Sequence, residues 1–267
     1  MWRNVVLLIL LCLLLDVYAG KPKSDFFKIR VAQWNIGQLS KGKKRCTAIT
    51  HKEREAKAKE YSRLINDVRA DIFCVSEYAP FFSLNDNLQE DSTFLTHKAI
   101  FSIYPECAYG ERYGANCNFI AVAYGAINKF TTVDYKTKQQ HRYYSSGEIK
   151  VNGVKVKLVS THLDIPQYVE ERKTQAVELL SILRNEPYVI LCADFNMLDT
   201  SEYDIFKKEG FCMANHGVLG DLVTFPNKEG GYCLDNIICK GFSIMGVDVY
   251  KTQLSDHYVI AAELLMK

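Results

Sequence analysis

The segment from Tyr188 to Asn196, YVILCADFN, constrains the fold of this chain more than any other stretch. Its apolar residues suit a buried strand, and the run stops abruptly at an acid and an amide. Residues two apart on a strand share a face, so Asp194 and Asn196 project side by side where the strand leaves the sheet. Ligands bind at this end of open α/β sheets, and burying such a pair without a partner is unfavourable. The segment therefore predicts a polar site at the end of a buried strand.

Other strand-like runs also end in polar groups of the acid-base or metal-ligand type. The groups are Asn35, Glu77, His162, Asp164, Asp235, Asp256 and His257. The first five lie in the runs FKIRVAQWNI, DIFCVSEY, VKVKLVSTHLD and YCLDNIIC, and the last two directly precede YVIAAELL. Each alone is explained as simply by a turn, a helix cap or a solvent-facing charge. Together they predict one site built from several strand ends.

Strand-like runs alternate with helical ones, which favours an α/β layered domain. Apolar positions recur at helical spacing from His51 to Arg69 and from about Gln167 to Arg184, and a shorter helix is predicted over Ser201–Lys208. Asn152-Gly153 is a strong signal for a two-residue hairpin. A core of strands flanked by two or three helices is expected.

The first nineteen residues have the layout of a secretory signal. Arg3 gives a short positive start, Val5 to Leu15 is almost wholly apolar, and Ala19 ends a stretch that suits cleavage. An uncleaved anchor is the weaker alternative, because the apolar run is short for a membrane span. We therefore expect a signal peptide at 1–19, a single domain at 20–267, and a secreted or periplasmic protein.

Charge and cysteine content allow several classes of function. Lys plus Arg number 33 against 31 Asp plus Glu, so bulk charge does not indicate a nucleic-acid binder, although a local basic rim would suffice for an enzyme. Cys74, Cys192 and Cys239 lie inside apolar runs, where buried free thiols are expected. Cys107 and Cys117 flank a Gly- and Tyr-rich loop and are the best candidates for a disulfide in an exported chain.

The motifs together resemble those of a known superfamily. In order, WNI, the acid of DIFCVSE, STHLD followed by Arg172 and Gln175, LCADFN, CLDNI and LSDHY resemble the endonuclease, exonuclease and phosphatase superfamily. The resemblance runs from about Arg30 to Leu265. It implies an α/β fold (α+β in some schemes), a four-layer sandwich of two packed β-sheets flanked by helices. It also implies a metal-dependent phosphoester hydrolase, and we expect a monomer.

The resemblance assigns metal ligands whose chemistry suits Mg²⁺. Glu77 is the first choice for direct ligation, with Asn35 beside it and Asp256 nearby. Mg²⁺ prefers hard oxygen ligands, commonly one or two carboxylates with several waters retained. Mn²⁺ and Ca²⁺ are alternatives.

The resemblance also assigns catalytic roles. His257 is the general base or the partner of the attacking water, and Asp235 accepts its other ring proton. His162 is a general acid or phosphate ligand, as in the deoxyribonuclease and sphingomyelinase branches. Asp194 would orient the nucleophilic water or a second metal, and Asn196 would donate to a phosphate oxygen.

Some features of the chain depart from the family pattern or leave alternatives open. Ser76 stands where the family often has Gln, and Val259 follows Tyr258 where Pro is usual. The acid that supports His162 is either Glu111 or Glu148. Arg172 and Gln175 are expected to tie a helix to the strand ends rather than to act in catalysis.

Three functions are consistent with these motifs. The first is a secreted Mg²⁺-dependent endonuclease acting on DNA or RNA. The second is a sphingomyelinase-like enzyme, or another phospholipid or sugar phosphoesterase. Phe81-Phe82 and Tyr143-Tyr144 are candidate membrane-docking aromatics for it, although paired aromatics more often belong to the core. The third is a binding protein that has lost catalysis on the same scaffold.

Overall fold

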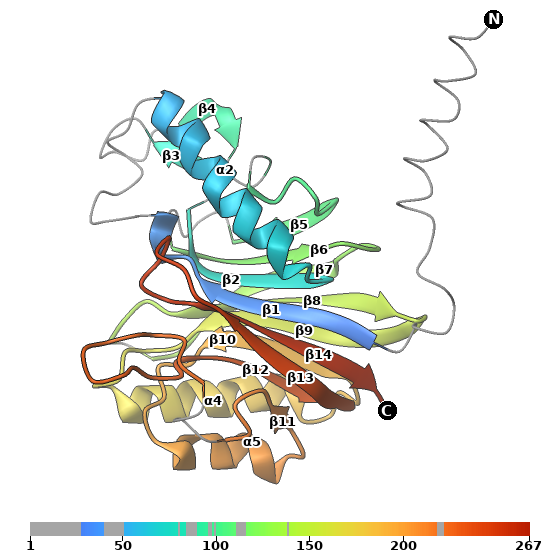
Figure 1. Cartoon of the computed structure of the whole chain (residues 1–267). Helices are drawn as coiled ribbons and strands as arrows, with labels where there is room; N and C mark the ends of the chain where they lie inside the picture. The colour runs from blue at the N-terminus through green and yellow to red at the C-terminus, as the bar shows by residue number, and fades with distance from the viewer. Residues whose placement is uncertain are drawn as a thin grey trace, which may run out of the picture.

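Two six-stranded sheets form the centre of the computed structural model (Figure 1). The structure describes residues 28–39, 51–79, 81–83, 90–95, 98, 100–110, 116–137, 139–217 and 222–267. The signal peptide expected at 1–19 lies outside these residues, and the domain boundary after it stays a prediction. Within the described part of the chain, none of the helices is long and apolar enough to cross a membrane.

The first sheet contains the strand that ends at Asn35. In spatial order its strands are β13 (Phe242–Tyr250), β14 (Val259–Met266), β1 (Lys28–Asn35), β2 (Ile72–Tyr78), β6 (Cys117–Val122) and β5 (Glu106–Tyr109). β1 and β2 are parallel, whereas β14 is antiparallel to β1. The ends of β1 and β2 and the beginning of β14 therefore share one edge of the sheet.

The second sheet contains the YVILCADFN strand. In spatial order its strands are β11 (Cys212–Met213), β12 (Asp235–Lys240), β10 (Val189–Asp194), β9 (Val154–His162), β8 (Tyr143–Val151) and β7 (Asn128–Asp134). β10 is parallel to β9 and antiparallel to β12. The end of β9, the end of β10 and the beginning of β12 therefore lie side by side.

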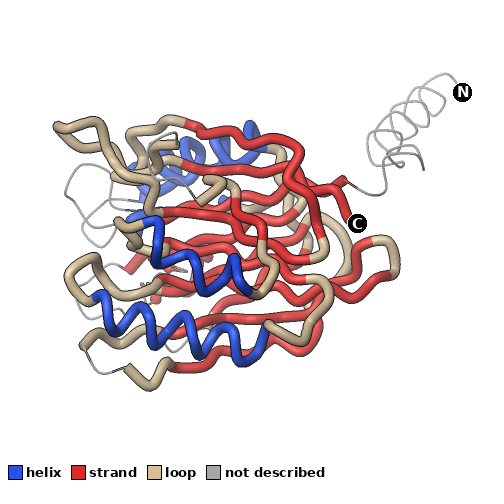
Figure 2. Tube along the Cα trace, turned by 90° about the horizontal axis from the view of Figure 1, so that it is seen from below, coloured by secondary structure: helices blue, strands red, loops and turns tan. Residues whose placement is uncertain are grey.

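The helices lie outside the two sheets. α2 (His51–Val68) covers the first sheet, and α4 (Val169–Leu183) and α5 (Asp204–Lys208) cover the second (Figure 1). Seen from below, helices lie in front of the strands (Figure 2). The 3₁₀ turns η2 (Gly37–Leu39) and η6 (Thr200–Tyr203) complete the helical segments. All three predicted helices are confirmed, the third as η6 continued by α5.

The side chains of the strands point alternately to the two faces of each sheet and form three apolar layers. On β1, Val31 packs between the two sheets, whereas Ala32 and Trp34 pack on the side of α2. A third layer, which includes Leu179 and Phe206, joins the second sheet to α4 and α5. The four-layer sandwich expected from the sequence is thus confirmed. A small additional sheet pairs β3 (Phe81–Ser83) with β4 (Glu90–Leu95).

The predicted hairpin is confirmed between β8 and β9. Val151 pairs with Val154, and the two residues between them have φ of 55° at Asn152 and 80° at Gly153. Positive φ at both central positions is the geometry of the type I′ turn, whose twist matches the flanking strands. This turn fixes the register of the strand that ends at His162.

The predicted disulfide between Cys107 and Cys117 is wrong. The two sulfurs are not bonded, because the register of β5 and β6 places Cys107 opposite Ala121, and Cys117 lies farther along β6, opposite Tyr78 of β2. The thiols expected to be free and buried, at Cys74, Cys192 and Cys239, are so.

Candidate active site at the joined ends of the two sheets

The strand register brings three predicted site residues into one row. Asp194 at the end of β10 pairs with His162 on one side and with Asp235 on the other. All three side chains are buried. His162 and Asp194 end their strands and Asp235 begins its strand. Each lies on the same strand face as residues that pack between the sheets, namely Leu158, Cys192 and Ile237, so its side chain is directed into that layer.

His257 forms the shortest polar contact in this group. Its Nδ1 lies 2.6 Å from Oδ2 of Asp235, and its Nε2 lies 3.8 Å from Oδ2 of Asp194. The backbone carbonyl of His257 accepts a hydrogen bond of 3.1 Å from Trp34 Nε1, which anchors it to the first sheet. The imidazole therefore bridges one carboxylate behind it and another in front.

Asn35 connects the two sheets at the same place. Its Nδ2 lies 2.9 Å from Oδ2 of Asp194 and 3.3 Å from Oε1 of Glu77. Its Oδ1 accepts a hydrogen bond of 3.0 Å from the amide of Gly37. An amide donor shared by two carboxylates offsets part of their repulsion, as a cation between them would.

His162 and Asn196 form the opposite wall. Nδ2 of Asn196 lies 3.1 Å from Nε2 of His162, and its backbone amide donates to Oδ1 of Asp194 at 3.1 Å. With Nε2 accepting from the amide, the proton of the neutral ring sits on Nδ1. That Nδ1 is buried without a hydrogen-bond partner in the described residues and lies 3.8 Å from Oε1 of Glu77.

Asp256 differs from the other predicted site residues because its side chain is exposed. Oγ of Ser255 lies 3.2 Å from Oδ1 of Asp256 and 2.7 Å from the carbonyl oxygen of Asn35. The structure thus gathers Asn35 and the other six predicted residues into one connected group and places Asp256 at its rim.

Two site residues have a left-handed backbone. Glu77 has φ of 53° and Asn196 has φ of 52°. Asn tolerates this region, whereas it is unfavourable for Glu by roughly 1–2 kcal/mol. At Glu77 the pairing of β2 with β6 is interrupted between Val75 and Tyr78, so the strand end turns the carboxylate toward the site. The backbone is strained where the chemistry is expected.

Crowding of carboxylates changes the acidity of this group. Burial, followed by the charge of Asp235, raises the pKa of Asp194 to about 6. Burial alone would lower the pKa of His257, but the carboxylates of Asp235 and Asp194 outweigh it and raise this pKa to about 10. Burial, with the charges of Arg142 and His257, holds the pKa of His162 well below its usual range.

Arg142 is a site residue that the sequence pattern did not reveal. It directly precedes β8, and its Nε donates to Oε1 of Gln140 at 3.0 Å. Burial lowers the pKa of its guanidinium, and the carboxylates of Asp194, Asp164 and Glu77 oppose that effect. Its position before a strand with no polar end gave no signal of a functional role. It supplies a positive charge beside the acids.

Arg172 and Gln175 tie α4 to the strand ends, as expected. The guanidinium of Arg172 forms a buried two-point ion pair with Glu202, with contacts of 3.0 and 2.9 Å. Gln175 accepts from the backbone amide of Asp164 and donates to its carboxylate, both at 3.0 Å. The contacts of Arg172 and Gln175 are structural.

Of the two acids considered as supports for His162, Glu148 is excluded. It lies on β8 and pairs with Lys129 at 3.2 Å and with Lys155 at 3.8 Å. Glu111 lies outside the described residues. Among the described residues, the acid that lies near Nδ1 of His162 is Glu77, whose Oε1 is 3.8 Å away.

A loop before β12 holds the Asp235–His257 pair from outside. Oγ1 of the buried Thr224 accepts from the amide of Asp235 at 3.0 Å, and its carbonyl accepts from the amide of Tyr258 at 2.6 Å. The ring of Phe225 packs on His257 with centroids 4.9 Å apart. Gly231, at φ of 115°, allows this loop to close, because a Cβ there would lie 2.6 Å from the carbonyl oxygen of Phe225.

The donor set fits a divalent cation. Three carboxylates, of Glu77, Asp194 and Asp235, are linked through Asn35 and His257, and Asn35 adds an amide oxygen if it turns. These acids outnumber the positive groups beside them, Arg142 and His257. One ligand atom each of Asp194, Asp235 and His257 lies within 4.8 Å of the others, so this trio can also hold an ion. Coordination by Nδ1 of His257 would break its 2.6 Å hydrogen bond to Asp235, whereas coordination by Glu77 and Asn35 would leave that hydrogen bond intact.

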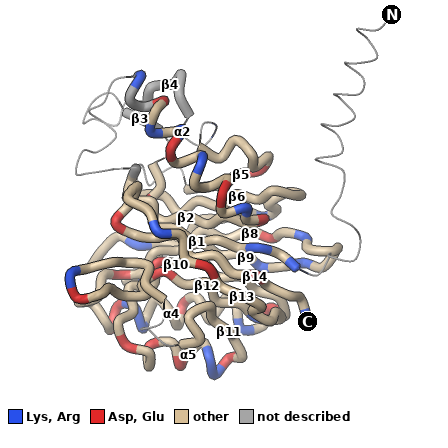
Figure 3. Tube along the Cα trace, viewed as in Figure 1, with Lys and Arg blue, Asp and Glu red and all other residues tan. Residues whose placement is uncertain are grey.

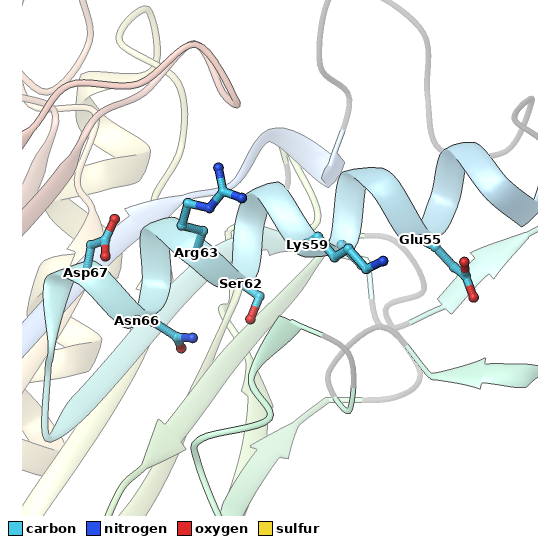
Figure 4. Close-up of a pocket in the computed structure, with 7 residues that line it drawn as sticks. Glu55, Lys59, Ser62, Arg63, Asn66 and Asp67 are labelled. Carbon is cyan, nitrogen blue, oxygen red and sulfur yellow. The ribbon is translucent and has the colours of Figure 1, made fainter.

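Other charged features lie away from this group. A hollow of about 630 Å³ runs along α2 (Figure 4), and it is lined by Glu55, Ala58, Lys59, Ser62, Arg63, Asn66 and Asp67. Lys and Arg are interspersed with Asp and Glu over the tube in Figure 3.

The aromatic pair Tyr143-Tyr144 is buried, so it belongs to the core, which is the more common place for paired aromatics, and it does not form a membrane-docking surface. The side chains of Phe81-Phe82 lie outside the described residues.

Comparison with known proteins identifies the fold. An endonuclease/exonuclease/phosphatase protein from Beutenbergia cavernae matches with a TM-score of 0.69 at 15% sequence identity, over 90% of this chain and 72% of that chain. The chain has the endonuclease/exonuclease/phosphatase fold. Neither a protein-family model nor a curated protein matches the sequence. Two further solved structures that are similar to this chain carry bound molecules.

The first is TDP2 from D. rerio complexed with a single-strand DNA product, which matches with a TM-score of 0.67 and 16% identity over 89% of this chain and 98% of that chain. The second is the human Nocturnin catalytic domain with a bound sulfate anion, with a TM-score of 0.64 and 18% identity over 90% of this chain and 95% of that chain. The endonuclease/exonuclease/phosphatase fold thus extends over most of the chain.

Proposed function

We propose that the protein is a secreted, Mg²⁺-dependent phosphodiesterase that cleaves nucleic acid. The observation that carries the proposal is the Asp235–His257 hydrogen bond of 2.6 Å, placed 3.8 Å from Asp194 at the end where both sheets meet. A carboxylate behind an imidazole fixes the ring orientation and strengthens its basicity. Together with the Asn35–Glu77 contact, this arrangement matches the requirements of phosphoester hydrolysis.

The residues divide the work of hydrolysis among them. His257 presents Nε2 toward Asp194, so the two groups can orient a water molecule and take its proton. The side-chain amide of Asn196 donates to Nε2 of His162 and to the carbonyl oxygen of Leu163, so it holds the ring of His162 in place. The Nδ1–H of His162 then offers a neutral donor to a phosphate oxygen, and Arg142 adds positive charge nearby. A neutral donor stabilises the anion without the tight ground-state binding that a full charge gives.

Glu77 and Asn35 are the residues that would hold the cation, with Asp256 at the rim. When bound, Mg²⁺ would neutralise the phosphate under attack and offset the carboxylates that keep His257 protonated. Mn²⁺ and Ca²⁺ also bind carboxylate and carbonyl oxygens, so they are alternatives to Mg²⁺ at this site. Burial and the neighbouring charge of Asp235 raise the pKa of Asp194 to about 6, and a cation beside these carboxylates would offset both effects.

Nucleic acid is the proposed substrate. The similar TDP2 structure holds a single-strand DNA product, and Nocturnin holds a sulfate, an analogue of phosphate in charge and shape. The buried Tyr143-Tyr144 pair removes one argument for a phospholipid substrate. Secretion is proposed from the first nineteen residues alone, whose layout is that of a cleavable signal.

A substrate panel tests the proposal. Purified protein with Mg²⁺ is incubated with single-stranded DNA, duplex DNA, RNA, sphingomyelin vesicles and inositol phosphates. We expect cleavage of a nucleic acid and loss of it on addition of a chelator. Hydrolysis of the lipid or sugar phosphates alone would move the substrate to another branch of the fold, and full biological effect in a His257→Ala variant would support a non-catalytic protein.

A further inference from the structure

A buried glutamine lies directly beneath the proposed active site. Gln33 is two positions before Asn35 on β1, and residues two apart on a strand share a face. Since Val31 packs between the sheets and Trp34 packs toward α2, the side chain of Gln33 enters the layer between the sheets. It is fully buried there.

The amide of Gln33 connects the two sheets. Its Nε2 lies 3.1 Å from Oγ of Ser76 and 3.4 Å from Oδ1 of Asp235. Oγ of Ser76 in turn donates to the carbonyl oxygen of Thr161 at 3.2 Å. Gln33 and Ser76 belong to the first sheet, whereas Thr161 and Asp235 belong to the second, so this chain of hydrogen bonds crosses the sandwich.

Packing alone does not account for this residue. Oε1 of Gln33 is buried and has no hydrogen-bond partner among the described residues. A buried acceptor left without a partner is unfavourable, and an apolar side chain of similar volume would avoid that loss. The opposite orientation of the amide would place an oxygen against the carboxylate of Asp235, so the charge of Asp235 decides which way the amide points.

We propose that Gln33 is a positioning residue that orients the carboxylate of Asp235 toward His257. Asp235 is then held at three atoms: Oδ1 by Gln33, the backbone amide by Thr224, and Oδ2 by Nδ1 of His257. The side-chain hydrogen bonds of Gln33 go to Ser76 and Asp235, so it acts on His257 only through Asp235. The effect of Gln33 on catalysis rests on the proposed function, whereas its effect on the Asp235–His257 hydrogen bond does not.

The Gln33→Met variant tests the role in catalysis, because it keeps the length of the side chain and removes the donor. We expect kcat to fall on the order of 10- to 100-fold, as for other partners that orient a functional group, with little change in KM. In an Asp235→Asn background the same substitution should cause no further loss, since the carboxylate that Gln33 orients is already gone.

A spectroscopic measurement tests the role without any substrate. Proton NMR of the metal-free protein should show a downfield resonance from the Nδ1 proton of His257, assigned by its loss in a His257→Gln variant. We expect this resonance to move in Gln33→Met. Ser76→Ala, which removes one anchor of the Gln33 amide, should move it less.

Ser160→Ala is the matched control. Ser160 lies two residues after Leu158 on β9 and so faces the same layer between the sheets, and its hydroxyl is buried without a partner in the described residues. This variant should leave both kcat and the resonance unchanged, and urea unfolding should show that each variant is folded.

The two proposals can fail separately. Gln33→Met and Ser76→Ala proteins that both keep the wild-type resonance would overturn the positioning role, whatever the activity. A wild-type protein that hydrolyses none of the phosphodiesters would overturn the proposed function, and the resonance would still decide the role of Gln33.

Discussion

Asp235 and His257 are 22 residues apart in the chain, and a hydrogen bond of 2.6 Å joins Oδ2 of the acid to Nδ1 of the imidazole. Asp235 begins β12 in the second sheet, and His257 precedes β14 in the first. Because the pair spans the two sheets, the packing of the whole sandwich sets its geometry.

The Asp235→Asn variant should lose most of its activity while keeping its fold. The amide matches the carboxylate in shape but no longer supports a charged imidazole or fixes its tautomer. We expect kcat to fall by about 10²- to 10⁴-fold, the usual contribution of general acid-base catalysis, with a smaller change in KM. Steady-state kinetics on the cleaved nucleic acid measure this, and a variant with near wild-type kcat would contradict the assigned role.

Stability of the metal-free protein should fall as pH rises from 6.5 to 8. The folded pKa of His257 is raised to about 10, above the ordinary 6.5, so the stabilisation is fully present below pH 6.5 and is lost as pH rises through 10. In this window the unfolded chain releases a proton that the folded chain keeps, which gives a slope of about 1 kcal/mol per pH unit.

Urea unfolding in a chelator at several pH values measures that slope. The window lies below the pH at which thiols and tyrosines ionise in the unfolded chain. The His257→Gln variant should show a much flatter dependence. An equal slope in both proteins would show that His257 is not held in its charged form.

At position 77, glycine should give a more stable protein than alanine. Its φ of 53° favours glycine over alanine, so Glu77→Gly should be more stable than Glu77→Ala by about 1 kcal/mol. Both variants lose the carboxylate and should lose activity. At Lys155, an ordinary strand position on β9, the order of the same two substitutions should reverse. Chemical denaturation compares the four variants, and an equal order at both positions would contradict strain at Glu77.

The Arg172–Glu202 pair should matter for stability rather than for chemistry. Both side chains are almost fully buried, so removing one leaves the other charge without its partner. Arg172→Ala is expected to lower the free energy of unfolding by about 3–5 kcal/mol. The combined Arg172→Ala and Glu202→Ala protein should lose less than the sum of the single losses. The kcat of the combined variant, measured well below its unfolding temperature, should remain near that of the wild type.

Much of the fold was predictable because the pattern of apolar residues is regular where elements are buried. β10 is buried along its whole length, and α2 has one apolar stripe. β7 and β5 were not predicted, since their residues are largely exposed or half-buried and show no clear alternation. The same regularity revealed most of the site, because polar residues interrupt it at Asn35, His162 and Asp194.

Two of the residues that sequence reasoning missed lack that signal. Arg142 lies before β8, and Thr224 lies in a loop, so neither ends an apolar run. Gln33 could have been found, because it breaks the apolar face of β1 two positions before Asn35. The disulfide prediction failed because loop spacing alone does not reveal which strands pair or in what register.

Cleavage of a labelled single-stranded oligonucleotide, followed as Mg²⁺ is titrated, tests the central claim most directly. Wild-type protein should cleave in proportion to bound Mg²⁺ and stop when the ion is chelated. Glu77→Gln should need far more Mg²⁺, and His257→Ala should stay slow at saturation. Cleavage that is independent of Mg²⁺, or undiminished in the His257→Ala protein, would contradict the assignment of this site.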